Sequence, residues 1–419
     1  MNSDLPDFVR RRMEVVYLRR VREDWGGQHL FRGRHPGPRA IRLDTNDYLD
    51  LTAAPELAAA HATAASMRDR GTLMSAVFQQ GGPQERLEVD FAAFLGHPAV
   101  MLCQSGFAAN TGLLQSVASP GVPVYLDMMA HASFREGILS ARADAVAFRH
   151  NDVEDLCNQI RQRGPGLVVA DSVYSTHGTL CPLATLTRAA AEMGCFVVID
   201  ESHALGTHGS HGEGLVASLK LQPWVHAVTA SLSKAFAGRG GLVACDPVLA
   251  EYLRFTSVPA IFSSALQQQD LAHLEAALAL IRNADAQRIR LHSNARRIRS
   301  GLHELGYFVS SGTEQIIALE PGREPLALTL YNALAAHEIF GAIFCPPATA
   351  RNRAILRLSV HCGLSEEDLH HILAACAEIR DEVKLSEWRS TRKWKGLETP
   401  SVLSAPPVRE GAATGGVAR

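Results

Sequence analysis

The stretch that decides the fold is Val197-Val198-Ile199-Asp200-Glu201-Ser202-His203, an apolar run that ends in an acid and then a histidine. The run predicts a buried strand. A carboxylate directly after such a strand is costly to bury unless it is paired. Lys234 follows 34 residues later, in Thr229-Ala230-Ser231-Leu232-Ser233-Lys234-Ala235-Phe236, after another short apolar stretch. That interval is long enough for a helix and a return strand.

Short apolar runs alternate with helical stretches over residues 56–330, which predicts a mostly parallel sheet covered on both faces. The runs are Val100–Cys103, Val122–Leu126, Gly166–Ala170, Phe196–Ile199 and Gly241–Ala244. A helical linker over 267–305 leads to a small α/β unit with a strand at Ile355–Val360. We expect an N-terminal arm and small segment at 1–55, a large domain at 56–300, a small C-terminal α/β domain at 301–385, and a disordered tail at 386–419.

The composition of the 419 residues narrows the class of protein. Hydrophobic residues make up 47%, charged residues 20%, and the net charge is −2, which argues against nucleic-acid binding. The eight cysteines form no Cys-x-x-Cys pair and suit the reduced thiols of a cytoplasmic protein. There is no apolar signal core or membrane-length apolar run. The histidines lack ligand spacing with cysteines or acids, so we expect no metal site.

Residues 7–25 read as a strongly basic helix with one mostly apolar side. Its arginines are Arg10, Arg11, Arg12, Arg19, Arg20 and Arg22. The segment is either a docking arm with a solvated face or a contact for the phosphates of a coenzyme A (CoA) thioester. The sequence leaves both interpretations open.

Candidate site residues recur at the carboxyl ends of the predicted strands, where ligands bind in open α/β sheets. Gln104-Ser105-Gly106-Phe107 follows a strand and opens a helix, either as an ordinary cap or as a phosphate cradle. His131 is either structural or stacks on an aromatic ring. Ser175 is either a turn serine or a ligand contact.

Asp200, His203 and Lys234, with the turn Gly238-Arg239-Gly240-Gly241, favour chemistry with pyridoxal 5′-phosphate (PLP). This cofactor needs a lysine for a Schiff base, a carboxylate that keeps the ring nitrogen protonated, and small residues that hold the phosphate. Asp200 suits the ring nitrogen, and His203 could donate to the ring 3-hydroxyl oxygen. Taken alone, Lys234 would read as an ordinary surface lysine.

The chain resembles the α-oxoamine synthase family of fold-type I PLP enzymes over about residues 5–384. The most specific matches are Asn46-Asp47-Tyr48-Leu49, Asp200-Glu201-Ser202-His203-Ala204-Leu205-Gly206 and Ser231-Leu232-Ser233-Lys234. The resemblance implies a seven-stranded, mostly parallel sheet in the large domain and a small C-terminal α/β domain. It also implies an obligate homodimer with the active site at the subunit interface.

The same resemblance implies a role for each matched residue. Lys234 would carry PLP and act as the general base, Asp200 would pair with the ring nitrogen, and His203 would contact the ring oxygen. His131 would stack on the ring, and Ser175 would contact the ring oxygen or the substrate. Gly106, Phe107 and Ser231 would hold the phosphate, and Ser263 or Ser264 would reach the phosphate in the partner subunit's site. Asn46 and Arg357 would bind the substrate carboxylate.

The chain departs from the common family pattern in ways that resemble one subgroup, the α-hydroxyketone-type quorum-sensing autoinducer synthases. The usual Ser-Met-Asp-Gly is Ser175-Thr176-His177-Gly178 here, and Ala237 replaces the usual glycine three residues after the lysine. The segments shared with the subgroup are Leu5–Phe8, Gln104–Gly106, Asp171–Thr179, Gly206–Gly209 and Pro259–Ser264.

The subgroup resemblance implies an acyltransferase that condenses S-adenosylmethionine or 2-aminobutyrate with a medium-chain fatty acyl-CoA. Loss of CoA and CO₂ would leave an α-aminoketone precursor of an α-hydroxyketone signal. One alternative is an 8-amino-7-oxononanoate synthase or a serine palmitoyltransferase-like enzyme. Another is a non-catalytic partner subunit, although such subunits typically lose the lysine that is present here. Neither the acyl chain length nor the amino donor follows from the sequence.

Overall fold

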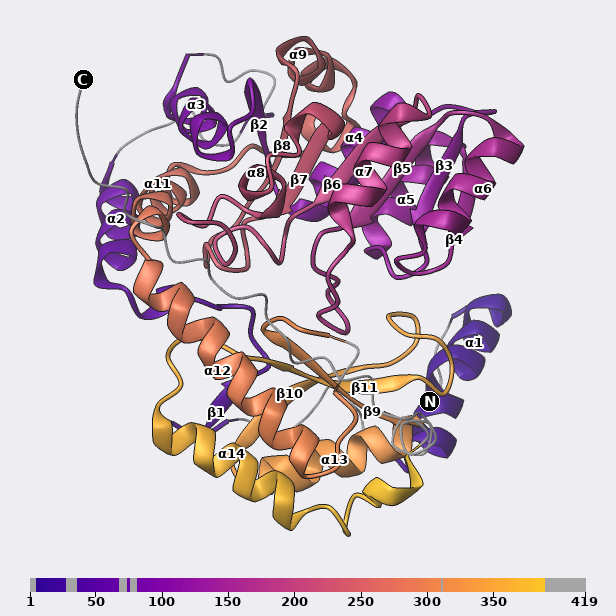
Figure 1. Cartoon of the computed structure of the whole chain (residues 1–419), viewed down its shortest axis with the longest axis vertical. Helices are drawn as coiled ribbons and strands as arrows, with labels where there is room; N and C mark the ends of the chain where they lie inside the picture. Colours follow the sequence, from indigo (N-terminus) through magenta and orange to yellow (C-terminus); the bar gives the residue numbers. More distant parts are fainter. Residues whose placement is uncertain (1–4, 28–35, 68–73, 76–80, 310–311, 389–419) are drawn as a thin grey trace, which may run out of the picture.

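The computed structural model describes residues 5–27, 36–67, 74–75, 81–309 and 312–388. Two sheets, each with its own helices, lie one above the other in the view of Figure 1. The long helix α12 (Asp285–Glu304) runs from the upper body into the lower one (Figure 1).

The large sheet has seven strands in the order β2-β8-β7-β6-β5-β3-β4. Strand β8 runs antiparallel to both of its neighbours, and the other strands are parallel to one another. The predicted seven-stranded, mostly parallel sheet is therefore confirmed. The strands are β2 (Ala99–Cys103), β3 (Pro123–Asp127), β4 (Asp144–Phe148), β5 (Leu167–Asp171), β6 (Phe196–Asp200), β7 (Ala227–Ser231) and β8 (Gly241–Cys245).

Helices cover both faces of this sheet, which explains its nearly continuous apolar strands. In β6, Val197 and Ile199 join one buried cluster and Val198 joins the opposite one. The first cluster includes residues of α3 (Pro83–Leu95), α6 (Val153–Arg163), α7 (Leu183–Glu192) and α11 (Gln268–Arg282). The second includes residues of α4 (Gly106–Val117), α5 (Ala132–Ala141), α9 (Pro247–Thr256) and α10 (Val258–Ile261).

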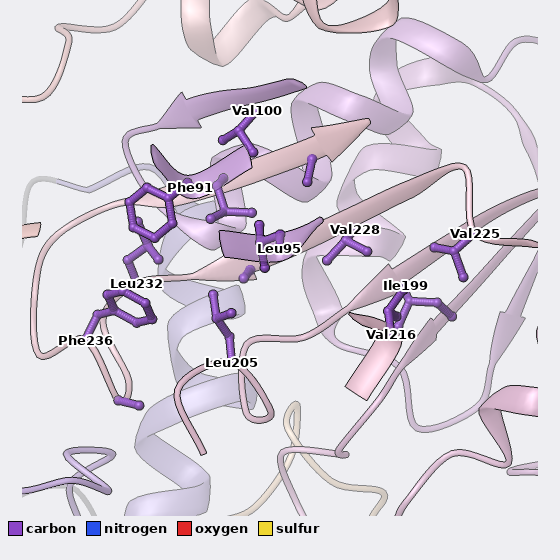
Figure 2. Packing of buried hydrophobic residues seen from close by; sticks show 14 of the residues in the cluster. Phe91, Leu95, Val100, Ile199, Leu205, Val216, Val225, Val228, Leu232 and Phe236 are labelled. Carbon is purple, nitrogen blue, oxygen red and sulfur yellow. The ribbon is translucent and has the colours of Figure 1, made fainter. Parts of the chain in front are cut away.

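Aromatic and aliphatic side chains fill the first cluster, part of which Figure 2 shows from close by. Phe91 of α3 and Phe236, two residues after Lys234, lie with their ring centroids 5.5 Å apart. The loop that carries Lys234 is thereby held against the core of the sheet. The remaining helices of the large body are α2 (Pro55–Ser66) and the short α8 (Leu215–Ser218).

The small sheet has the order β1-β10-β11-β9 and packs against α12, α13 (Glu324–Ala336) and α14 (Glu366–Glu378). Its strands are β1 (Ile41–Leu43), β9 (Ile316–Gly322), β10 (Ile339–Phe344) and β11 (Ala354–Ser359). Because β1 pairs in parallel with β10, the N-terminal segment is built into the C-terminal unit. The domain boundaries stay a prediction.

The described chain continues past residue 385, where the sequence places the start of a tail. Leu385 and Trp388 are buried in the core of the small sheet. The remainder of the predicted disordered tail, residues 389–419, lies outside the described residues.

The N-terminal arm consists of α1 (Asp7–Met13) and two π-helical turns, Glu14–Leu18 and Arg20–Asp24. Figure 1 places it beside the small sheet. Arg20 Nη2 lies 2.8 Å from Glu324 Oε1 of α13, and the indole of Trp25 donates to the same carboxylate. These contacts support the docking interpretation for Arg20. No helix of the described chain combines the length and the apolar character needed to cross a bilayer.

Candidate active site at the carboxyl ends of the large sheet

Asp200, the last residue of β6, is buried and well supplied with hydrogen-bond donors. Asn110 Nδ2 donates to Asp200 Oδ2 over 2.7 Å, and the Ser202 amide donates to Oδ1 over 2.8 Å. The side chain of Asp200 makes no salt bridge within the described residues. A buried carboxylate with neutral donors and no cation suits a ligand that brings a positive charge.

A hydrogen-bonded chain connects Asp200 to His131, the residue that caps α5. Asn110 Nδ2 also donates to Ser133 Oγ over 2.9 Å, and Ser133 Oγ lies 2.7 Å from His131 Nδ1. The backbone amide of His131 donates to Asp171 Oδ1 over 3.1 Å. Burial and the neighbouring Asp200 raise the pKa of Asp171 well above its usual value. Asp171 therefore takes up a proton more readily than an ordinary aspartate.

The N-terminus of α4 offers a cradle for an anion. Ser105 caps the helix by accepting from the Ala108 amide over 3.0 Å, and its carbonyl accepts from Ala109. Gly106 and Phe107, the two residues between this cap and Ala108, have backbone amides with no acceptor among the described residues, so both can bind a ligand. A Cβ on Gly106 would come within 2.6 Å of Ser231 Cβ, so only glycine allows this close approach of helix and strand. Ser231 Oγ, at the end of β7, lies 2.8 Å from Ser233 Oγ.

Lys234 follows β7 and is partly buried. Burial and the positive charge of Arg357 lower its pKa, while Asp200 acts in the opposite direction. A lysine with a lowered pKa is more often in the neutral amine form, which is the nucleophile for a carbonyl carbon.

His203 lies beneath this cluster, 5% exposed, with its Nδ1 2.7 Å from the hydroxyl of Tyr48. Burial lowers the pKa of His203 well below its usual range, and the charges of Lys234 and Arg357 act in the same direction. The backbone carbonyl of His203 accepts from Gln315 Nε2 over 2.8 Å. Tyr48 and Gln315, which lie far apart in the sequence, therefore hold His203 in place, and its lowered pKa favours the neutral imidazole.

Arg357 on β11 reaches from the small sheet toward the same cluster. Its Nη2 donates to Asn46 Oδ1 over 2.9 Å and its Nη1 donates to the Ser175 carbonyl over 2.9 Å. The guanidinium carbon lies 4.6 Å from the centre of the Phe344 ring. No carboxylate of the described residues pairs with Arg357, and its Nε is buried without a partner. A ligand carboxylate would compensate this buried charge.

The structure brings most of the predicted site residues together. Two others, Ser263 and Ser264, are predicted to act in the site of the partner subunit. Ser263 and Ser264 follow α10 and are exposed, and Ser263 Oγ donates to the Pro259 carbonyl. Their predicted action in the partner subunit's site stays a prediction. Exposed Phe107 likewise offers its backbone amide, because its ring points away from the core.

Comparison with known proteins decides the family. The model for aminotransferase class I and II matches residues 38–375. The chain belongs to this family. Within this family, the curated relatives reported below are α-oxoamine synthases. The resemblance predicted from the sequence is therefore confirmed.

Two relatives represent these matches. The CAI-1 autoinducer synthase of Vibrio campbellii is 40% identical over 382 residues, which cover 91% of this chain and 97% of the relative. Serine palmitoyltransferase of Caulobacter vibrioides is 30% identical, covering 82% of this chain and 86% of the relative.

Solved structures agree with the fold. Serine palmitoyltransferase of Sphingomonas wittichii superimposes with a TM-score of 0.83 at 25% identity, covering 91% of this chain and 99% of that one. A structure of SPT with PLP gives 0.84 at 26% identity, covering 90% of this chain and all of that one. The fold is fold-type I, and the cofactor of this α-oxoamine synthase is PLP.

The residues present fit PLP by their chemistry. The buried carboxylate of Asp200 suits a protonated ring nitrogen, the free amides of α4 suit a phosphate, and Lys234 has a lowered pKa. When bound, PLP supplies an electron sink for charge that develops on the α-carbon of an amino-acid substrate.

Four supporting residues of this α-oxoamine synthase escaped the sequence analysis: Tyr48, Asn110, Gln315 and Phe344. A local signal existed for Asn110, which lies four residues after Gly106 and so faces the same side of α4. Tyr48 stands two residues after Asn46 in a matched motif. Gln315 and Phe344 carried no local signal. The contact of Gln315 with His203 depends on how the two sheets pack, and that of Phe344 with Arg357 depends on the pairing of β10 with β11.

Proposed function

We propose that this α-oxoamine synthase is a PLP-dependent acyltransferase that joins an amino-acid-type donor to a medium-chain fatty acyl-CoA. The donor is S-adenosylmethionine or 2-aminobutyrate. The product, after loss of CoA and CO₂, is an α-aminoketone precursor of an α-hydroxyketone quorum-sensing signal. The likeness to a CAI-1 autoinducer synthase over 97% of that protein's length supports the synthesis of an autoinducer.

The observation that carries the proposal is the buried guanidinium of Arg357 without a carboxylate partner, close enough to Lys234 to lower its pKa. In the proposed reaction Arg357 and Asn46 bind the donor carboxylate, which directs the α-carbon toward Lys234. A bidentate arginine–carboxylate contact fixes that orientation.

Lys234 accepts the α-proton in the proposed reaction. When PLP is bound, His203 would contact the ring oxygen and His131 would stack on the ring. A bond then forms between the α-carbon and the acyl carbonyl carbon, and the CoA thiolate leaves. The carboxylate departs as CO₂, and a proton returned to the α-carbon completes the aminoketone. Asp200, oriented by Asn110, would pair with the ring nitrogen of PLP.

We also propose that the protein is a homodimer whose active site lies at the subunit interface. Three large apolar side chains beside Ser263 support this: Phe255 is 71% exposed, Val258 48% and Phe262 80%. Large apolar side chains that are exposed close together in the sequence are consistent with an interaction site. Sedimentation analysis should give the mass of two chains, and a monomeric mass would contradict the proposal.

The decisive experiment is an absorbance spectrum of the purified protein, followed by S-adenosylmethionine and then a medium-chain acyl-CoA. We expect a visible cofactor band that moves with S-adenosylmethionine, and free thiol on addition of the acyl-CoA. A band that responds only to alanine, serine or glycine would favour an 8-amino-7-oxononanoate synthase or serine palmitoyltransferase, in line with the second relative. No band after added PLP would favour a non-catalytic partner subunit.

The Lys234→Ala variant tests the role of the lysine. It should lose condensation, whereas Lys220→Gln, which changes an exposed lysine, should keep it. Condensation at the wild-type rate in purified Lys234→Ala would overturn the proposed mechanism.

A further inference from the structure

Three side chains that the proposed reaction does not use meet where the two sheets adjoin. His208 lies in the loop after β6, His292 on α12, and Glu314 just before β9. One ligand atom from each lies within 4.8 Å of the other two. His208 Nε2 is 2.8 Å from Glu314 Oε2, and His292 Nδ1 is 3.6 Å from the same oxygen.

The hydrogen bonds of His292 determine which of its ring nitrogens has a lone pair. His292 Nε2 lies 2.8 Å from the backbone carbonyl oxygen of Thr207. A carbonyl only accepts, so Nε2 carries the proton. In the tautomer with its proton on Nε2, His292 has a lone pair on Nδ1. Its Nδ1 therefore turns a lone pair toward Glu314.

The same residue, Thr207, orients His208. The Thr207 hydroxyl directs its single proton to the carbonyls of His203 and Ala204, at 2.9 and 3.0 Å. His208 Nδ1, 2.9 Å from that hydroxyl oxygen, must then be the donor. In the tautomer with its proton on Nδ1, His208 has a lone pair on Nε2, which faces Glu314.

Two imidazole lone pairs and one carboxylate oxygen consequently point into one space. Glu314 Oε2 is the oxygen that both rings approach. A proton between His208 and Glu314 would give these two residues a hydrogen bond. The lone pair of His292 Nδ1 would still face an oxygen that only accepts, and so would have no partner there. One divalent cation would satisfy all three groups.

The spacing suits zinc in particular. In a tetrahedral zinc site, neighbouring nitrogen and oxygen ligands lie about 3.4 Å apart. The observed separations of 2.8 and 3.6 Å lie on either side of that value. A backbone carbonyl and a hydroxyl that each accept from the far ring nitrogen are the usual outer partners of metal-bound histidines. Thr207 supplies both.

We propose that His208, His292 and Glu314 form a binding site for a zinc-class divalent cation. The site would link the large sheet, α12 and the small sheet through one ion. A hollow lined by Ser210, Arg288 and Arg296 adjoins the two histidines and leaves a fourth coordination position for water. Arg296 places a positive charge near His292 and so acts against any cation, which means that the ion must bond strongly to imidazole.

The site also touches the proposed reaction centre through hydrogen bonds. The His203 carbonyl accepts from the Thr207 hydroxyl and from Gln315, the residue next to Glu314. An ion that joins His208 to Glu314 would therefore hold the start of β9 against the loop that carries His203. The sequence alone gives no hint of this, because the three ligands come from separate segments.

The test is isothermal titration of zinc chloride into the untagged, PLP-bound full chain after treatment with a chelator. We expect one equivalent bound with a Kd on the order of micromolar or tighter. His292→Gln and Glu314→Gln should each weaken binding at least about tenfold. His371→Gln, which changes an exposed histidine on α14, should bind as the wild type does.

Cobalt provides a readout that needs no variant. Addition of Co²⁺ to the wild type should produce the visible bands of a tetrahedral ion, and their position should report nitrogen and oxygen ligands rather than thiolates. The PLP absorbance of each variant checks that it is folded. No zinc binding by the wild type would overturn the proposal and leave a His208–Glu314 ion pair. Binding that is unchanged in both variants would also overturn it.

Discussion

Asn110 Nδ2 lies 2.7 Å from Asp200 Oδ2, and it is the link between this carboxylate and the His131 side of the site. The amide is nearly inaccessible, and its own Oδ1 is buried without a partner. Asn110 therefore acts as a positioning residue for Asp200. It fixes the carboxylate in the orientation that a protonated ring nitrogen requires.

The Asn110→Ala variant should retain PLP less well. A hydrogen bond to a charged group contributes about 1.5–3 kcal/mol, which corresponds to a fall in cofactor affinity of about 10–100-fold. Titration of cofactor-free protein with PLP, followed by absorbance, measures the affinity. Asn158→Ala on the exposed side of α6 is the control. Equal affinity in Asn110→Ala and wild type would show that Asp200 needs no such support.

Replacement of Arg357 by lysine should raise KM for the amino donor far more than for the acyl donor. Lysine keeps the positive charge but loses the planar pair of donors that binds a carboxylate. The loss of a charged hydrogen bond, about 1.5–3 kcal/mol, predicts a change of about 10–100-fold. Arg353→Lys, at an exposed arginine 3.5 Å from Glu320, is the matched control. A similar change in both KM values would place the amino donor's carboxylate elsewhere.

The lowered pKa of Lys234 predicts how cofactor-free protein responds to pH. The rate of recombination with PLP should rise with pH and level off below the ordinary lysine value of 10.5. Because the folded pKa lies below the unfolded one, the stability of the cofactor-free protein should also increase as pH rises between the two values.

The Arg357→Gln variant separates the causes of this shift. Removal of the guanidinium charge should move the midpoint of the recombination profile to higher pH, since Arg357 is the second cause after burial. The Arg353→Gln variant should leave the midpoint in place. If Arg357→Gln leaves the midpoint unchanged, burial alone would account for the lowered pKa of Lys234.

Local sequence patterns were sufficient for the parts of the site that lie at strand ends. Asp200 and Lys234 follow neighbouring parallel strands, whose carboxyl ends meet at one edge of the sheet. The contact between Tyr48 and His203 joins residues 155 positions apart, and it depends on the N-terminal segment being held in the small sheet through β1. The contact of Arg357 with the Ser175 carbonyl likewise requires the two sheets to be packed. Periodicity carries no information on such packing.

The packing of residues 386–388 is a second feature that local patterns did not predict, and Trp388 tests it. Its ring centroid lies 5.8 Å from that of Tyr307, and its Nε1 donates to the Val383 carbonyl over 2.8 Å. Truncation of a buried tryptophan costs about 3–5 kcal/mol, so Trp388→Ala should lower the urea midpoint clearly. Val89→Ala, at a position 64% exposed on α3, should leave it nearly unchanged. Equal midpoints for the two variants would end the folded unit near residue 385, where the sequence composition changes.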